Sequence, residues 1–395
     1  MSYIAYGIFS DSNNTTPRVG ARFNNAIIDI SKLPKLGILD INLDQIFNAQ
    51  ILNPFMEYPQ HLREKIKPAL ETFLSNMQNS TYKNQQIIYN NNEITMHMPI
   101  KVMGYTDFYT SEAHATHIGR IFRPDDQPLL PNWKHIPIAY NGRASSIVIS
   151  GYPIKRPKGQ IFNPSINAPE LIPCQKLDFE VELGVIIGKK NELGTSININ
   201  DASSYIFGVC ILNDWSARDI QSWEYQPLGP FNSKGFATSI SPWIIPIEEL
   251  DKFKVPIISQ DPKPLDYLLC DDDYLYDIHF EAILKPKNSK DQVIISKTNF
   301  KFMYWTISQW IAHHTISGTS LNPGDILGSG TISGFEKGTL GCLMEITKNG
   351  QNPITLPNGE LRSFLQDGDE LIIKAYCGAD RELDFGSVTG VIVPS

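Results

Sequence analysis

One segment of this chain alternates acidic and apolar side chains, and this pattern restricts what the segment can fold into. Within residues 176–188, positions 177, 179, 181, 183 and 185 are apolar, whereas 178, 180 and 182 are acidic. A period of two indicates a β-strand, in which the acidic side chains share one face and the apolar ones face a core. Neighbouring like charges cost stability unless a cation lies between them. The segment therefore predicts a strand that presents Glu180 and Glu182 to a cation.

Two more carboxylates are candidates for the same cation. Asp107 belongs to a polar block, and Asp214 follows the apolar run 207–212. Oxygen ligands without a cysteine or histidine cluster favour Mg²⁺ or Ca²⁺ over zinc. Each group also has a plainer interpretation, because Asp214 suits a helix N-cap and the glutamates suit a solvated strand face. The sequence alone does not bring the four carboxylates together.

A histidine and a helical face are the candidates for acid–base chemistry. His114 lies seven residues after the first of these carboxylates, and a neutral imidazole accepts a proton near pH 7. A lone histidine is more often structural, and spacing identifies no acidic partner for it. Arg218, Gln221 and Tyr225 have the spacing of one face of a helix beginning just after residue 214, and the alternative is an exposed polar surface.

The glycine-rich run 328–334 resembles an anion-binding loop, but it lacks the ending of a phosphate loop. A tight turn that directs backbone N–H groups toward a carboxylate is the better interpretation.

The chain as a whole has the composition of a globular protein. It has 395 residues, which suggests two or three domains, and its net charge of −8 disfavours a nucleic-acid partner. Five scattered cysteines without a CxxC motif suit reduced thiols in a cytoplasmic protein. We expect no signal peptide, and no apolar run approaches the length of a membrane span.

The distribution of strand and helix patterns predicts a domain boundary near residue 98. Before it, strands are expected over 3–9, 18–23 and 26–30, and a helix over 60–77 that Pro68 kinks or divides. After it, one helix is expected over 300–314. The predicted strands are 146–150, 179–187, 205–212, 277–284, 292–295, 342–346, 370–375 and 388–393. This order favours a β sandwich, roll or barrel with a few helices attached.

Several blocks of the sequence together resemble the fumarylacetoacetate hydrolase family. They are Asp107-Phe-Tyr-Thr-Ser111, Pro131-Asn-Trp133, Gly142-Arg-Ala-Ser-Ser146, Leu177-Asp-Phe-Glu-Val-Glu182, Asn213-Asp-Trp-Ser-Ala-Arg-Asp-Ile-Gln221, Trp223-Glu-Tyr-Gln-Pro-Leu-Gly-Pro-Phe231 and Gly328-Ser-Gly-Thr-Ile-Ser-Gly334. The likeness extends over essentially the whole chain, and it is looser before residue 105 than after it.

The resemblance implies a mainly β (α+β) fold. It consists of a small N-terminal SH3-like β-barrel over residues 1–98 and a large C-terminal mixed β-roll with a few helices over 99–395. It also implies a cytoplasmic homodimer that acts on a small diketo acid, with no nucleic-acid or membrane partner. The implied reaction is metal-dependent hydrolysis of a carbon–carbon bond in 4-fumarylacetoacetate, giving fumarate and acetoacetate, with Mg²⁺ and/or Ca²⁺ as cofactor. This is the last step of tyrosine and phenylalanine catabolism.

Position by position, the resemblance also assigns roles to side chains. The implied metal ligands are Asp107, Glu180, Glu182 and Asp214, and Lys234 and Thr238 match further positions associated with the metal. The implied catalytic base is His114, and the carboxylate that orients it is Glu345. The side chains that match oxyanion-stabilising groups are Arg218, Gln221 and Lys234. The side chains that match substrate-binding positions are Tyr109, Arg123, Tyr140, Gln221, Tyr225 and Thr331.

Three positions depart from the family pattern, and two other functions stay open. Asn141 stands where a histidine is usual, His117 where an asparagine is usual, and Phe335 where a proline is usual. The first alternative is a related acylpyruvate or β-diketone hydrolase or lyase, against which the N-terminal region argues. The second is a non-catalytic protein stabilised by a divalent cation, against which the complete set of catalytic side chains argues.

Overall fold

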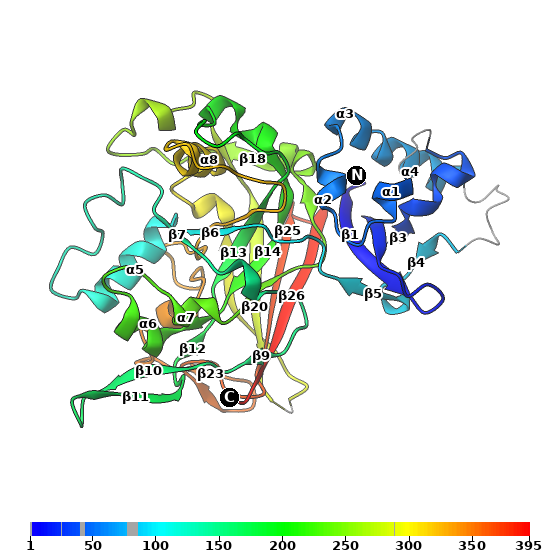
Figure 1. Ribbon diagram of the computed structural model, residues 1–395. Helices are drawn as coiled ribbons and strands as arrows, with labels where there is room; N and C mark the ends of the chain where they lie inside the picture. Colours follow the sequence, from blue (N-terminus) through cyan, green and yellow to red (C-terminus); the bar gives the residue numbers. More distant parts are fainter. Residues whose placement is uncertain (1, 25, 40–43, 77–85, 288) are drawn as a thin grey trace.

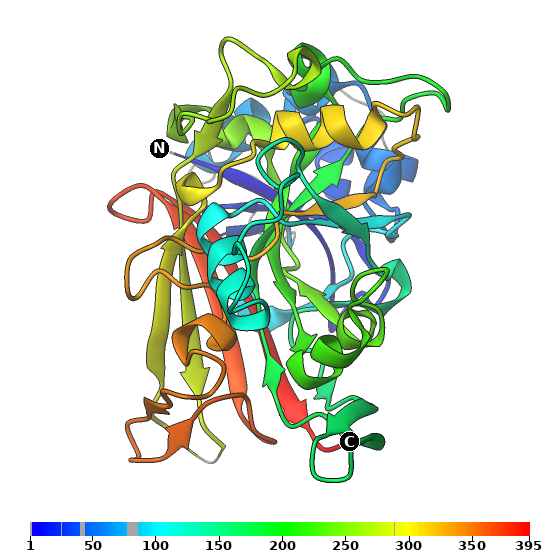
Figure 2. The same ribbon diagram turned by 90° about the vertical axis from the view of Figure 1, so that its left-hand side faces the viewer.

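The chain forms a small N-terminal unit and a larger unit that carries the C-terminus (Figure 1). A computed structural model describes residues 2–24, 26–39, 44–76, 86–287 and 289–395. Most of its regular structure is β, and the sheets are curled, which confirms the predicted fold class. In Figure 2 the long strands of the larger unit run along one side of the molecule.

The N-terminal unit is one antiparallel sheet with short helices packed on it. The strand order is β4 (Ile88–Tyr89), β3 (Ala26–Asp29), β2 (Arg18–Phe23), β1 (Ile4–Asp11) and β5 (Ile94–His97). The helices are α1 (Asp44–Phe47), α2 (Asn53–Met56), α3 (Gln60–Arg63) and α4 (Ile66–Asn76). The three predicted strands are confirmed. The expected helix over 60–77 is divided into α3 and α4, with Pro68 in the first turn of α4, where its missing N–H is tolerated. Met77 lies outside the described residues.

Two sheets form the centre of the larger unit. The first contains β7 (Ala139–Asn141), β6 (Tyr105–Phe108), β22 (Ile326–Gly328), β13 (Val181–Ile187), β14 (Ile206–Asp214), β16 (Thr238–Ile240) and β8 (Ile147–Ile149), and β17 (Ile245–Pro246) pairs with β14. The second contains β21 (Val293–Asn299), β20 (Ile278–Lys285), β25 (Glu370–Cys377), β26 (Leu383–Val393) and β9 (Ile154–Lys155). β14 contacts β25 and β26, so the two sheets enclose a common core.

Smaller elements surround these sheets. The paired short strands are β10 (Lys158–Asn163) with β11 (Ala168–Pro173), β12 (Leu177–Asp178) with β15 (Ser216–Ala217), β18 (Lys254–Pro256) with β19 (Tyr274–Tyr276), and β23 (Ile354–Thr355) with β24 (Leu361–Arg362). The helices are α5 (Glu112–Phe122), α6 (Arg218–Glu224), α7 (Asn232–Gly235), α8 (Ile307–Thr315) and α9 (Leu343–Ile346). Of the helix expected over 300–314, residues 300–302 form a separate 3₁₀ turn and α8 begins at Ile307.

The strand predicted over 342–346 is wrong, because residues 343–346 form the short helix α9. A short apolar run does not distinguish a strand from a buried helix. The deciding contact comes from far away in the sequence. The carboxylate of Asp178 accepts hydrogen bonds from the backbone N–H groups of Leu343 (2.7 Å) and Met344 (2.9 Å). These are donors that a helix N-terminus leaves without an internal partner.

The N-terminal unit shares a hydrophobic core with one face of the first sheet. Ile186, Cys210 and Leu212 pack in the same cluster as residues of β1 and α2. Phe207 is buried there beside the rings of Tyr6 and Phe55, at centroid distances of 6.4 and 6.0 Å. The face of β13 that was predicted to carry the acidic row also carries Ile186, and the strand is buried along its whole length.

We expect Phe207→Ala to lower the free energy of unfolding by about 3–5 kcal/mol, because it empties space that both units fill. Urea denaturation followed by circular dichroism measures this change. Phe231→Ala is the matched control, because that ring is 74% exposed. Equal midpoints for the two variants would show that the shared core contributes little.

Candidate metal and hydrolytic centre

The pairing register of the first sheet brings the four carboxylates together. Asp107 of β6 lies opposite Gly328 of β22, and Gly328 lies opposite Gly184 of β13. Glu182 is two residues from Gly184 on the same face, and Asp214 ends the neighbouring strand β14. Glu180 directly precedes β13.

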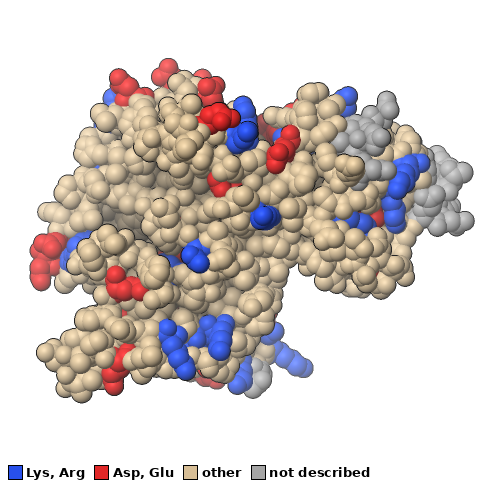
Figure 3. Space-filling view, in the orientation of Figure 1, with Lys and Arg blue, Asp and Glu red and all other residues tan. Residues whose placement is uncertain are grey.

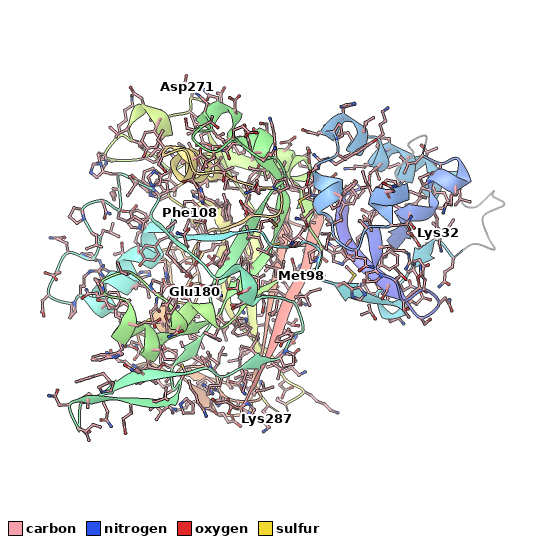
Figure 4. The ribbon with its side chains drawn as sticks, in the orientation of Figure 1. Lys32, Met98, Phe108, Glu180, Asp271 and Lys287 are labelled. Atoms are coloured by element: carbon pink, nitrogen blue, oxygen red, sulfur yellow. The ribbon has the colours of Figure 1, made fainter. Side chains whose placement is uncertain are left out.

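One oxygen of each carboxylate lies within 4.8 Å of the others, and all four residues are buried. In Figure 4 Glu180 is labelled in the interior of the larger unit.

Glycine at position 328 makes room for this group. A Cβ atom there would lie 2.9 Å from Asp107 Oδ1 and 2.9 Å from Glu182 Oε2, which is closer than real Cβ contacts. Just beyond it, the backbone N–H of Gly330 donates to Glu182 Oε2 at 3.1 Å. This contact confirms the prediction that the glycine-rich run directs an N–H group toward a carboxylate.

The four carboxylates differ in their electrostatic surroundings. Burial, followed by the charges of the neighbouring carboxylates, raises the pKa values of Asp107 and Glu182 well above their ordinary range. Burial also acts on Glu180, but Lys234, Arg218 and His114 outweigh it and lower the pKa of that group. Lys234 Nζ lies 2.5 Å from Glu180 Oε2 and 2.6 Å from Asp214 Oδ2. One end of the cluster is thus neutralised by protein cations, and the other end is not.

The residues at the unneutralised end suit a divalent cation. Asp107 Oδ1 and Glu182 Oε1 are buried and have no hydrogen-bond partner among the described residues. Buried polar atoms without a partner are costly, and a hard cation would satisfy both oxygens. Thr238 Oγ1 donates to Asp214 Oδ1 at 3.0 Å, so it acts on the cluster through that carboxylate.

Helix α6 supplies the cation on the other side of Glu180. Arg218, its first residue, lies with Nη2 2.8 Å from Glu180 Oε1, while its Nε donates to Asp178 at 2.9 Å. Its Nη1 donates to Gln221 Oε1 at 3.1 Å, which confirms that Arg218 and Gln221 share a helix face. Tyr225 caps the end of α6, and its ring packs 5.5 Å from that of Phe122.

His114 and Glu345 form a buried pair beside the carboxylates. Ser111 caps α5 by accepting from the backbone N–H of His114, which fixes this residue in the first helical turn. His114 Nδ1 lies 2.7 Å from Glu345 Oε2 in α9, and its Nε2 lies 4.0 Å from Glu180 Oε1. His114 is therefore within hydrogen-bonding distance of the Glu345 carboxylate through Nδ1, and its Nε2 atom faces the carboxylate cluster.

The predicted substrate-binding residues are distributed around this centre. The Tyr140 hydroxyl donates to Asp214 Oδ2 at 3.2 Å, and the Tyr109 ring lies edge-on to His114 at 5.4 Å. Thr331 is buried, and its hydroxyl has no partner among the described residues. Arg123 ends α5 and donates to the carbonyl of Pro128 at 2.9 Å, so part of its guanidinium is already engaged.

Sequence reasoning missed two residues that hold this centre together. Asp178 is fully buried between Arg218 and the N-terminus of α9, and it could have been found as the third member of the acidic alternation. His117 Nδ1 lies 2.8 Å from Glu345 Oε1. The three-residue spacing between His114 and His117 was a signal that both project from one side of a helix.

Comparison with known proteins decides the family. The model described as fumarylacetoacetate hydrolase C-terminal matches residues 105–392, and the model described as fumarylacetoacetase N-terminal matches residues 3–99. The chain belongs to the fumarylacetoacetate hydrolase family. Fumarylacetoacetase from Homo sapiens is 42% identical over 99% of this chain and 95% of its own length. Fumarylacetoacetase from Arabidopsis thaliana is likewise 42% identical, over 99% of this chain and 95% of its own length.

Solved structures with low sequence identity to this chain have the same fold. A fumarylacetoacetate hydrolase from Exiguobacterium antarcticum is 15% identical and superposes with a TM-score of 0.56, covering 99% of this chain and 100% of that one. A maleylpyruvate hydrolase from Sphingobium is 15% identical and superposes with a TM-score of 0.53. The match covers 99% of this chain and 100% of that one.

Charged side chains of both signs are mixed on one face of the molecule. On the face in Figure 3, Lys and Arg form small separate groups interspersed with Asp and Glu. Within the described ranges, no helix has both the length and the apolar character needed to cross a membrane.

We expect Gly328→Ala to weaken Mg²⁺ and Ca²⁺ binding by about 10-fold or more, because the added methyl group displaces Asp107 and Glu182. Isothermal titration calorimetry measures the affinity. Gly235→Ala is the control, since its nearest neighbour would be 3.9 Å away. An unchanged affinity in the Gly328 variant would exclude a site between these two carboxylates.

Proposed function

We propose that this chain hydrolyses a carbon–carbon bond of 4-fumarylacetoacetate, giving fumarate and acetoacetate, the last step of tyrosine and phenylalanine catabolism. The observation that carries this proposal is the buried His114–Glu345 pair facing four convergent carboxylates. Related proteins also support the proposal, because the chain is similar to curated fumarylacetoacetases over nearly its full length. The enzyme is a hydrolase that acts on a carbon–carbon bond between ketone groups.

In the proposed mechanism His114 takes a proton from water through Nε2. Glu345 accepts the hydrogen bond from Nδ1, fixes the tautomer, and stabilises the imidazolium that forms. Hydroxide then adds to the carbonyl carbon on the fumaroyl side. The bond between this carbon and the acetoacetate carbon breaks, and the imidazolium returns its proton to that leaving carbon. One water is consumed, and no covalent enzyme intermediate is required.

Charged and polar side chains would stabilise the oxyanion that forms on the attacked carbonyl. We assign this role to Arg218, Gln221 and Lys234, which lie on α6 and α7 beside Glu180. Removal of one preorganised donor of this kind typically costs about 10²–10³ in rate. The residues proposed to contact substrate are Tyr109, Arg123, Tyr140, Gln221, Tyr225 and Thr331.

The proposed metal ligands are Asp107, Glu180, Glu182 and Asp214, with Lys234 and Thr238 acting on them. A divalent cation held there would supply Lewis-acid stabilisation of the enolate charge on the leaving group. All four ligands are carboxylates, so we propose Mg²⁺ or Ca²⁺ as the ion. We also propose a cytoplasmic homodimer, with the boundary between an SH3-like domain and a catalytic domain near residue 98.

A second candidate is hydrolysis of a related acylpyruvate. The specific observation in its favour is the similar fold of the maleylpyruvate hydrolase. The same metal scaffold and the same base would serve both substrates, so the pocket decides between them.

We expect purified protein to remove the ultraviolet absorbance of 4-fumarylacetoacetate when Mg²⁺ or Ca²⁺ is added, and to lose this activity after chelation. An acylpyruvate and maleylpyruvate are measured under the same conditions. Faster turnover of either comparison substrate would favour the second candidate. Absence of turnover of all three with both ions would refute a hydrolytic function of this kind.

We expect His114→Ala to lower kcat by about 10²–10⁴-fold and to leave metal affinity unchanged, because it removes the base but no ligand. If His114→Ala keeps its activity, water is activated by another group.

In contrast, Asp214→Asn should weaken metal binding and turnover together. Parallel assays of turnover and calorimetric metal titrations separate the effects of the two substitutions.

A further inference from the structure

Glu345 is held by two histidines, and only one of them has a role in the mechanism above. His114 Nδ1 contacts Oε2 at 2.7 Å, and His117 Nδ1 contacts Oε1 at 2.8 Å. The two histidines lie three residues apart in α5, so they project from the same side of that helix onto α9. The Glu345 carboxylate therefore bridges two side chains that lie about one turn apart on the same helix.

The protonation of this group follows from its contacts. Burial would raise the pKa of Glu345, but the charge of His114 and the hydrogen bonds from His114, His117 and Ser333 outweigh it and lower that pKa. An ionised carboxylate only accepts hydrogen bonds, so both histidines donate through Nδ1–H. In the neutral form of His114, a proton on Nδ1 leaves Nε2 as an acceptor, and Nε2 is the atom that faces the cluster.

The two oxygens of Glu345 are unequally supported. Oε2 accepts from His114, from Ser333 Oγ at 2.7 Å and from Cys342 Sγ at 3.2 Å. Among the described residues, His117 is the one donor recorded for Oε1. The Glu345 side chain is fully buried, so losing His117 would leave this oxygen without a partner in a place that water reaches poorly.

The position of His117 is itself restricted. Its side chain is 23% exposed, compared with 4% for His114, so it closes the outer side of the pair. The Phe335 ring packs edge-on against it at a centroid distance of 6.0 Å. His117 and Phe335 are two of the positions at which the sequence departs from the family pattern, and here they contact each other.

We propose that His117 is a positioning residue for the hydrolysis: its Nδ1–H holds Glu345 in the orientation in which that carboxylate aligns His114. The proposal rests on the proposed function, because it concerns the same base. A carboxylate supported at Oε2 alone can rotate about its terminal bond, and the imidazole that it aligns then loses its fixed direction. Small misplacements of reacting groups cost up to about 10²-fold in rate.

The first test compares variants at position 117 by steady-state kinetics. We expect His117→Ala and His117→Phe to lower kcat by about 10- to 100-fold, with KM and metal affinity close to the wild-type values. Their melting temperature should fall, because the buried Oε1 atom loses its donor. His117→Asn should recover most of the lost kcat, because its amide nitrogen can replace the Nδ1 donor. His135→Ala is the control, since that histidine is exposed on the surface. Full activity of His117→Phe, or equal loss in the Asn and Ala variants, would overturn the proposal.

The second test asks whether His117 acts through Glu345. In a double-mutant cycle, His117→Ala should have no further effect on kcat once Glu345 is replaced by Ala, because the aligned group is already gone. Independent additive losses would mean that His117 acts by another route.

A third measurement does not depend on the substrate being correct. The Nδ1 proton of His114, hydrogen-bonded to Glu345, gives a low-field NMR signal that His114→Ala identifies by its loss. We expect this signal to shift or broaden in His117→Ala and to be restored in His117→Asn. An unchanged signal in His117→Ala would overturn the proposal even in the absence of turnover. Loss of all diketone hydrolysis with the expected signal changes would instead overturn the proposed function alone.

Discussion

The whole centre depends on keeping four carboxyl groups close together out of contact with water. Carboxylates that are buried side by side repel one another, and each loses its hydration. Lys234 and Arg218 offset this cost around Glu180, whereas Asp107 and Glu182 rely on a backbone N–H group and on the cation that we propose. The arrangement of α6, α7 and the glycine-rich run follows from this requirement, because each brings a positive or N–H group to a specific oxygen.

The sequence predicted what depends on short-range pattern. The strands β13 and β14, the carboxylates at and beside them, and the turn at Gly330 were all recognisable from alternation and glycine content. The helix α9 was not, because the short stretch Leu343–Ile346 is helical here with two backbone hydrogen bonds to Asp178. The pairing of His114 with Glu345 was available only from the family resemblance, since 231 residues separate the two side chains.

Convergence of the carboxylates could not be predicted either, for a different physical reason. It depends on which residues lie opposite each other in a sheet whose neighbouring strands are far apart in the chain. Asp107 reaches Glu182 only because Gly328, on the strand between theirs, has no side chain. A shift of one residue in either pairing would turn the carboxylates to the opposite face.

The shared core between the two units gives the small one a further role. Ile186, Cys210 and Leu212 lie on the same sheet face as Glu182 and Asp214, and residues of β1 and α2 cover them. A truncated chain beginning at residue 99 would expose this apolar row to solvent, and such patches promote association. The N-terminal unit thus covers this apolar row, and a shorter version of the chain would need a substitute for it, such as polar replacements along that row.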